Sequence, residues 1–550
     1  MRGGALAWLA AAALLLPGTT ARAQQAPAGP LAEAERAYET ARYWDDRVRL
    51  IGSLGSDTTP DGVPASRARD SLAHHVRRFQ AAIARLGETP RDPADRAVHA
   101  VLTRAARRGF DGLAGAESPR APVRCLDALP APPTLGGLTA RTMACYGAAA
   151  NRILFDGDTL NRLAVLGRLA QVDDSILRRR LFLALGPVWA AVNGDDEPDS
   201  PYRLLLRLRR AAWGGGPSPL ALKGPALGLP AGQLEDWLVT ALSAWRRAGP
   251  DSLVEPWDWY HANGAASRRL GPRIATVAAI ERVNRAFYAA IGADLAGLGV
   301  RFDLAPRPGK YPVAYTDFGA HRRVDDAGRL HPAEPWVFAS YLDGGLDNLA
   351  ELLHEAGHAI HIAALRGRPA LADWPDNDTF TEALADIAAQ EAYEPAWQFR
   401  FLGDSAPLAA SLRARYAGIM LDMAWALFEL RVHRTAEADP NRVWADITST
   451  YLGIRPHPEW SWWALRGQLV EDPGYLINYA LGAFMVADIR ARVLTLRGPG
   501  AWTDPGTYNL LARRLFQDGL ARPSRQVLEQ FLGRPLSPDP LLADLARLHP

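Results

Sequence analysis

The stretch that decides the fold is Leu353-His354-Glu355-Ala356-Gly357-His358-Ala359-Ile360-His361. It lies within 347–365, where apolar residues recur at three- and four-residue spacing and predict an amphipathic helix. On a helix, His354 and His358 project from the same face, because residues four apart are neighbours there. This is the H-E-x-x-H arrangement, in which two imidazoles bind zinc and the adjacent Glu355 serves as general base.

Glu382 is the candidate third zinc ligand. The segment 379–386 opens a second helical pattern after a connection rich in turn residues, and Glu382 follows His358 by 24 residues. That distance allows the first helix to end and the chain to return against it. Thr379-x-x-Glu382 also fits a capping box, in which Glu382 would bind backbone amides instead. Metal ligation is favoured, because a zinc site of this type needs a third protein ligand.

Two further residues near this motif have alternative interpretations. Asp386, one turn beyond Glu382, is a candidate acceptor for the second ring nitrogen of a ligand histidine, and otherwise a solvated acid. His361 shares the face of His354 and His358 and could be a ligand in a three-histidine zinc site. However, the metzincin pattern, which has such a site, requires a later Gly and His that this chain lacks. A packing or hydrogen-bonding role is therefore favoured for His361.

Most of the remaining sequence predicts helices. Strand signals are nearly absent before residue 300, whereas 311–318 and 335–341 are rich in β-branched and aromatic residues and predict a hairpin. This hairpin would precede the zinc helix, either as an edge strand that pairs with a peptide or as a structural flap. We expect a mainly α fold with an N-terminal helical region, 24–299, and a catalytic region, 300–550. The helical runs are 31–50, 66–86, 94–110, 151–170, 173–192, 202–213, 233–248 and 273–298.

The N-terminus has the features of a secretory signal. A basic start, a short apolar run at 5–16 and Ala21-Arg22-Ala23 predict a signal peptide over 1–23, with an uncleaved anchor as the alternative. Export places the chain in the periplasm or outside the cell. An oxidising compartment would favour a disulfide between Cys125 and Cys145, although two separate buried thiols are the alternative.

The overall charge excludes some functions. The chain has 62 basic and 60 acidic residues, a net charge of +2, so nothing favours nucleic-acid binding. No later segment has 18 uninterrupted apolar residues, and we expect no stable membrane insertion after signal cleavage. The sequence leaves the oligomeric state open.

A second motif lies near the C-terminus, at Gly474-Tyr475-x-x-x-Tyr479. Together with H-E-x-G-H-x-x-H and Phe380-Thr381-Glu382, it makes the chain resemble the thimet oligopeptidase/oligoendopeptidase family of zinc peptidases (gluzincins), and more distantly angiotensin-converting enzyme. The resemblance covers 256 to the C-terminus. It implies a two-lobed, neurolysin-like helical zincin whose deep channel admits oligopeptides. It also implies one zinc ion, held by His354, His358 and Glu382. Glu355 would be the base, Tyr479 the oxyanion donor and Tyr475 a substrate-positioning residue.

The sequence departs from this family at two places. After the third ligand the oligopeptidases usually carry Pro-Ser-Gln, where this chain has Ala383-Leu384-Ala385-Asp386, which is closer to the converting-enzyme pattern. The oligopeptidases carry a histidine shortly before the first tyrosine, where this chain has Gln468-Leu469-Val470. We predict a zinc metallopeptidase, either a metalloendopeptidase or a peptidyl-dipeptidase, acting on oligopeptides. The alternatives are a zinc-binding pseudoenzyme, a peptide-binding protein on the same scaffold, or a zinc hydrolase of another bond such as a cell-wall amide.

Overall fold

The structure is a computed structural model of the chain. It describes residues 29–548 except 114–132, 215–217, 231, 308–309, 311–312, 326 and 435–437. The predicted signal peptide, 1–23, and Cys125 lie outside the described residues. Cys145 is buried and disulfide-bonded, as the predicted pair requires.

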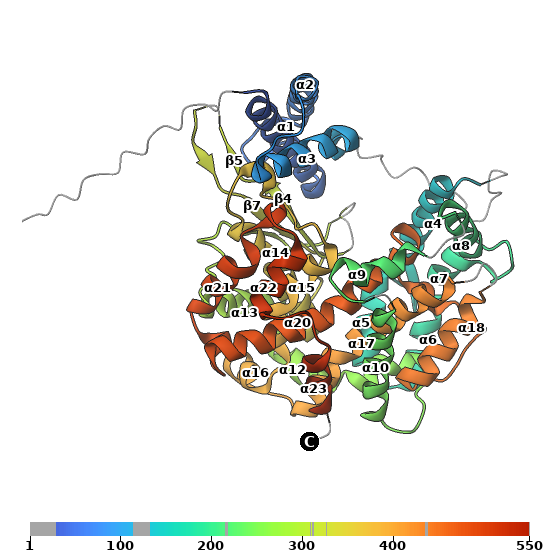
Figure 1. The fold of residues 1–550 in the computed structure, drawn as a ribbon. Helices are drawn as coiled ribbons and strands as arrows, with labels where there is room; N and C mark the ends of the chain where they lie inside the picture. The colour runs from blue at the N-terminus through green and yellow to red at the C-terminus, as the bar shows by residue number, and fades with distance from the viewer. Residues whose placement is uncertain are drawn as a thin grey trace, which may run out of the picture.

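The described chain is mainly α, with about 66% of it helical, and this confirms the predicted fold class. Figure 1 shows two large helical lobes, with the long helix α20 (Tyr475–Arg497) running between them and a small N-terminal helical unit above one lobe. No helix of the described segments is both long and apolar enough to span a bilayer.

The N-terminal unit consists of three helices with a core of their own. Tyr38, Leu72 and Phe79 are buried at its centre. Its apolar face also covers Ala370 and Leu371, which lie in the connection between the helix of the motif histidines and the helix of Glu382. The unit is therefore attached directly to the segment that leads into the site. Its helices are α1 (Pro30–Leu54), α2 (Ala65–Ile83) and α3 (Pro93–Arg108).

The middle of the chain is helical except for a short hairpin. The predicted helix over 151–170 is wrong in its first half, where β1 (Ile153–Phe155) pairs with β2 (Asp158–Leu160). Asp156 and Gly157 connect these strands with φ of 48° and 89°, the backbone that a two-residue hairpin turn requires. The helices of this part are α4 (Leu135–Ala150), α5 (Arg162–Gln171), α6 (Ser175–Leu183), α7 (Gly186–Asn193), α8 (Pro201–Ala212), α9 (Lys223–Ala226), α10 (Gln233–Arg247), α11 (Trp259–Asn263), α12 (Ala265–Leu270) and α13 (Val277–Ala290).

A small sheet lies against α14 (Leu346–Ala364), the helix that carries the two motif histidines. The predicted hairpin is present as β4 (Tyr315–Ala320) and β7 (Glu334–Phe338), which are antiparallel with Thr316 opposite Val337. A further strand, β3 (Arg301–Asp303), pairs parallel with β7, so β4 and β3 are the edges. The long connection forms a two-stranded extension, β5 (Arg323–Val324) and β6 (Leu330–His331).

The C-terminal helices complete the main core. Buried residues of the middle and C-terminal parts of the chain form one continuous apolar cluster, to which α14, α15, α17 and α20 contribute. The boundary predicted at residue 300 stays a prediction. The helices are α14 (Leu346–Ala364), α15 (Asp378–Ala389), α16 (Pro395–Leu402), α17 (Leu408–Val432), α18 (Pro440–Ile447), α19 (Gln468–Glu471), α20, α21 (Gly506–Leu511), α22 (Ser524–Leu532) and α23 (Asp539–Ala546).

Candidate active site

The site begins with the close crossing of α14 and α15. At Gly357, which lies between the two motif histidines, an added Cβ would stand only 2.2 Å from the carbonyl oxygen of Ala385. Real Cβ atoms do not approach a backbone oxygen so closely, so a glycine is required there. The absence of a side chain lets α15 approach the histidine face of α14, and this brings Glu382 within reach of both rings.

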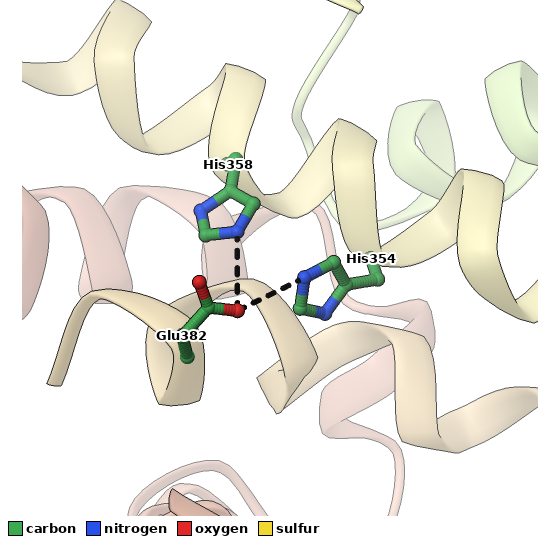
Figure 2. Close-up of side chains that lie close together, drawn as sticks. All are labelled: His354, His358 and Glu382. Carbon is green, nitrogen blue, oxygen red and sulfur yellow. Dashed lines mark ion pairs between the residues drawn. The ribbon is translucent and has the colours of Figure 1, made fainter. Parts of the chain in front are cut away.

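His354, His358 and Glu382 converge as the sequence predicted (Figure 2). The Nε2 atoms of His354 and His358 lie 3.4 and 3.7 Å from Oε2 of Glu382, and all the donor atoms lie within 4.8 Å of one another. Zinc bonds to nitrogen and oxygen are about 2.0–2.2 Å, so tetrahedral ligand atoms stand roughly 3.4 Å apart. The two imidazoles and one carboxylate therefore fit a single zinc ion in both chemistry and spacing.

Second partners hold these donors in place. Nδ1 of His354 lies 2.8 Å from Oδ1 of Asp386, which is the contact predicted for that aspartate. It fixes the ring so that Nε2 faces Glu382. Burial alone would raise the pKa of Glu382, but the hydrogen bonds from His354 and His358 outweigh it and hold the pKa well below its usual range. Glu382 is thus an ionised carboxylate, as a metal ligand must be.

The capping alternative for Glu382 is wrong. The N-cap of α15 is Asn377, whose side-chain oxygen accepts a hydrogen bond from the amide of Phe380. The Thr379 hydroxyl instead donates to Oδ1 of Asn478, at 3.0 Å. Because Asn478 lies between the two motif tyrosines, this bond ties the start of α15 to the start of α20 and fixes the tyrosines relative to Glu382.

Glu355 lies beside the ligands and has a partner that the sequence did not predict. The hydroxyl of Thr316, on the edge strand β4, lies 2.7 Å from Oε2 of Glu355 and 2.9 Å from its carbonyl oxygen. The alternation of the strand placed Thr316 on the same face as Phe318, but nothing local indicated that this face would meet α14. The sheet therefore orients the candidate base.

Tyr475 and Tyr479 enter from α20, and their rings contact edge to face with centroids 5.4 Å apart. The Tyr475 hydroxyl donates to Oε1 of Glu382 at 3.1 Å, so this residue supports a metal ligand. Burial, and next the charge of Glu382, raise the pKa of both tyrosines above the usual value. Both hydroxyls thus stay protonated near neutral pH and remain hydrogen-bond donors.

These groups line a single cavity of about 360 Å³. Its wall includes the candidate ligands, Glu355, both tyrosines and the edge-strand residues around Thr316. Trp374, from the connection before α15, closes one side and packs edge to face on His358, with ring centroids 5.5 Å apart. Substrate atoms in this cavity would therefore meet the candidate base, the ligands and the tyrosines together.

His361 is a packing residue, as predicted, and does not join the cluster of ligands. It is fully buried between Trp374 and Phe516, with ring centroids 5.7 and 5.3 Å away. Burial lowers its pKa to about 3, so the ring is neutral.

Comparison with known proteins identifies the fold. No protein-family model matches this sequence, and no curated protein sequence matches it. Among solved structures, it is similar to an M32 carboxypeptidase from Deinococcus radiodurans R1 (15% identity, TM-score 0.56, covering 94% of this chain and 98% of that one). It is also similar to an oligoendopeptidase F (17% identity, TM-score 0.53, covering 94% of this chain and 85% of that one). A third similar structure is Trypanosoma cruzi metallocarboxypeptidase 1 (14% identity, TM-score 0.51, covering 94% of this chain and 99% of that one). Over nearly its whole length, then, the chain has the fold of these helical metallopeptidases.

Proposed function

We propose that this protein is a zinc-dependent metallopeptidase that hydrolyses oligopeptides. The observation that carries the proposal is the convergence of His354, His358 and Glu382 in one cavity with Glu355 and Tyr479. Each of these groups has a role in amide hydrolysis, and the fold is one on which peptidases are built. The same residues without Glu355 would favour a pseudoenzyme, but the candidate base is present and oriented.

Glu355 is the proposed proton carrier. Zinc, held by His354, His358 and Glu382, would supply Lewis acidity that polarises the scissile carbonyl and makes water more acidic. The Glu355 carboxylate accepts the proton of the attacking water and later delivers it to the leaving amine. The hydroxyl of Thr316 holds one oxygen of the Glu355 carboxylate, and Glu355 lines the cavity.

Tyr479 is the proposed oxyanion donor. Attack on an amide places negative charge on the former carbonyl oxygen, which a fixed hydroxyl in the cavity stabilises. A phenol has one proton to donate, and Tyr475 already donates its own to Glu382. Tyr475 therefore contributes by holding the ligand and by shaping the cavity, and it meets substrate with its ring.

Cleavage position is the finer part of the proposal. The similar structures include proteins named as an endopeptidase and as carboxypeptidases, so the likeness supports peptide hydrolysis without fixing the position. We propose oligopeptide substrates cleaved as a metalloendopeptidase or a peptidyl-dipeptidase. Mass spectrometry of the products from N-blocked and C-blocked peptides separates internal cleavage from release of one or two C-terminal residues.

The experiment that tests the activity is hydrolysis of quenched fluorescent peptides, with metal content measured on the same sample. We expect turnover that is lost on chelation and restored by zinc. Cleavage of cell-wall fragments but not of peptides would favour the amidase alternative. Zinc binding without turnover of either substrate would favour the pseudoenzyme.

Export of the protein is a separate proposal, based on residues 1–23. We expect the mature chain to begin at Gln24 after removal of the signal peptide. N-terminal sequencing of protein from the periplasm or the culture medium tests this. Intact Met1 on cell-associated protein would contradict it.

A further inference from the structure

A second cavity adjoins the catalytic one. Its volume is about 540 Å³, and it shares Ala314, at the start of β4, with the catalytic cavity. Its wall is formed by the segment after β7, including Tyr341, and by the first turns of α14, including Glu351. Glu351 lies four residues before Glu355, so the two carboxylates stand on successive turns of the same helix. A peptide in the catalytic cavity could therefore extend into the second one.

Two polar groups of this wall, Glu351 and Tyr341, face each other and keep unused hydrogen-bonding capacity. Among the described residues Glu351 forms no close ion pair; the Tyr341 hydroxyl is its hydrogen-bonding neighbour, and Arg162 acts on it only through its charge. Tyr341 is only 6% exposed, and its buried hydroxyl, which faces Glu351, has no well-formed hydrogen bond among the described residues. Both groups can accept a hydrogen bond from a donor placed in the cavity.

The other charged groups of the cavity have partners. Arg268 donates to the carbonyl oxygens of Ala170 and His261, at 2.8 and 2.7 Å. Asp347 accepts a hydrogen bond from Ser267, at 3.0 Å. Asp343, at the exposed rim, accepts one from Asn348, and Arg168 lies 3.7 Å from Asp158. Arg268 and Asp347 thus use hydrogen-bonding groups within the protein, whereas the Glu351 carboxylate keeps acceptor capacity for a ligand in the cavity.

A largely buried carboxylate without a close cation costs free energy, because one neutral hydroxyl does not replace the water that the charged group loses. Burial, and next the neighbouring charge of Glu355, raise the pKa of Glu351. A cation bound between Glu351 and Tyr341 would remove this cost, whereas an apolar or anionic group would leave or increase it. The cavity is therefore built for a positively charged group.

We infer that the second cavity is a substrate subsite for a cationic group, in which Glu351 pairs with a Lys or Arg side chain or a terminal ammonium of a peptide whose scissile bond lies in the catalytic cavity. The inference rests on the proposed peptidase function and specifies its substrates. Because Glu351 is one helical turn from Glu355, we expect the cationic residue next to the scissile bond or one residue further away.

The test compares blocked peptides that carry Lys, Arg, norleucine or citrulline at each position around one cleavage site. We expect kcat/KM at one position to be about tenfold or more higher for Lys or Arg than for the neutral residues, as for a hydrogen bond to a charged group. Glu351→Gln should abolish this preference while kcat/KM for the neutral peptides stays within about threefold. Asp343→Asn, on the rim of the same cavity, should keep the preference. Peptides with free or acetylated N-termini distinguish a terminal ammonium from a side chain.

Binding provides a readout that needs no turnover. In the Glu355→Gln background, fluorescence anisotropy should show tighter binding of the Lys peptide than of the norleucine peptide, and Glu351→Gln should remove the difference. Cleavage of peptides with no preference at any position, or a preference that survives Glu351→Gln, would overturn the subsite and leave the peptidase standing. If the zinc-loaded enzyme cleaves no peptide, the proposed function itself fails, and the subsite with it.

Discussion

Two regions of this molecule differ in how their buried charged side chains are paired. Where α1 meets the sheet and the connection before α15, most buried charges have opposite charges as partners. His321 is 6% exposed; its Nδ1 lies 2.8 Å from Oδ2 of Asp46, and its Nε2 lies 3.3 Å from Oδ1 of Asp373. In the two cavities near α14, by contrast, the hydrogen-bonding neighbours of the acids among the described residues are neutral hydroxyls: Tyr341 for Glu351 and Thr316 for Glu355.

The paired network joins the N-terminal unit to the rest of the chain. Arg42 of α1 bonds Asp373 at 3.3 Å and the carbonyl oxygen of Pro369 at 2.7 Å. Arg49, also of α1, lies 2.8 Å from Oδ1 of Asp46 and pairs with Asp317 of β4. Figure 1 shows α1 above β4 and β7. Breaking such a network leaves buried charges without partners, so the network contributes to the stability of the fold.

The difference indicates where function resides. Charged side chains that already pair with one another are held in those pairs, whereas a carboxylate with unused acceptor capacity is available to a proton or a ligand. Substitutions near α14 should therefore change turnover and selectivity with little effect on stability. Substitutions near His321 should reduce stability with little effect on turnover and selectivity.

Glu355→Gln should have the largest effect. Loss of the proton acceptor should lower kcat by about 10³–10⁴, because general acid–base catalysis contributes on that order. Zinc content and Tm should stay at the wild-type values, since His354, His358 and Glu382 are untouched. Peptide hydrolysis and metal analysis on one preparation measure both. Full activity in the variant would remove Glu355 as the base.

Tyr479→Phe should have the second largest effect on turnover. Loss of one oxyanion donor should lower kcat by about 10²–10³, with a small change in KM. Tyr475→Phe is the matched control. It removes the bond to Glu382 and should weaken zinc affinity by about tenfold or more, as loss of a ligand's hydrogen-bond partner does. If the two variants behave alike, the division of roles between the tyrosines is wrong.

Thr316→Val should lower kcat by about tenfold, because Glu355 loses the group that orients it. Thr316→Ser, which keeps the hydroxyl, should recover most of the rate. Thr381→Val is the control, since Thr381 lines the same cavity but donates to the carbonyl oxygen of Asn377. Equal loss in the Val and Ser variants would indicate a packing role instead.

Asp46→Asn should have the smallest effect on turnover, within about threefold, and should instead reduce the free energy of unfolding by about 3 kcal/mol, as for a broken buried ion pair. Burial, and next Arg42, would lower the pKa of His321, but Asp46 and Asp373 outweigh them and raise it above 6.5. The stabilisation from this raised pKa is complete below about pH 6.5 and is lost as pH rises through the folded value.

Thermal denaturation between acidic and alkaline pH therefore checks the network. The wild type should lose stability as pH rises past the titration of His321, and Asp46→Asn should show a weaker dependence. Asp57→Asn, an exposed carboxylate just after α1, should behave as the wild type. A pH dependence unchanged in Asp46→Asn would show that His321 does not cause it.

The sequence predicted the local part of the site well. His354, Glu355 and His358 share one helix, so their relation follows from the helical period alone. Glu382 and Asp386 required only that a second helix return against the first, which the spacing allowed. Most helices were predicted near their observed ends. However, a new helix begins at Gly186, with Pro187 in its first turn, within the run over 173–192, and Gly292, with φ of 90°, follows the end of α13.

The non-local part could not be predicted. Thr316 meets Glu355 because a sheet edge packs on α14, and Tyr341 reaches Glu351 through the same packing. In the sequence, Glu351 is indistinguishable from an acid on a solvated helix face. The strand β3 is short, and its parallel partner β7 lies far along the chain, so no local pattern revealed the pairing.

Gly357 has a consequence for the choice of ion. Since backbone meets backbone where the two helices cross, the spacing of the helices limits how far the carboxylate can lie from the imidazoles. An ion that prefers longer bonds or six oxygen donors would fit this spacing less well. The spacing of the two helices therefore contributes to metal selectivity. Adding a methyl group at this position, as in Gly357→Ala, should weaken that selectivity.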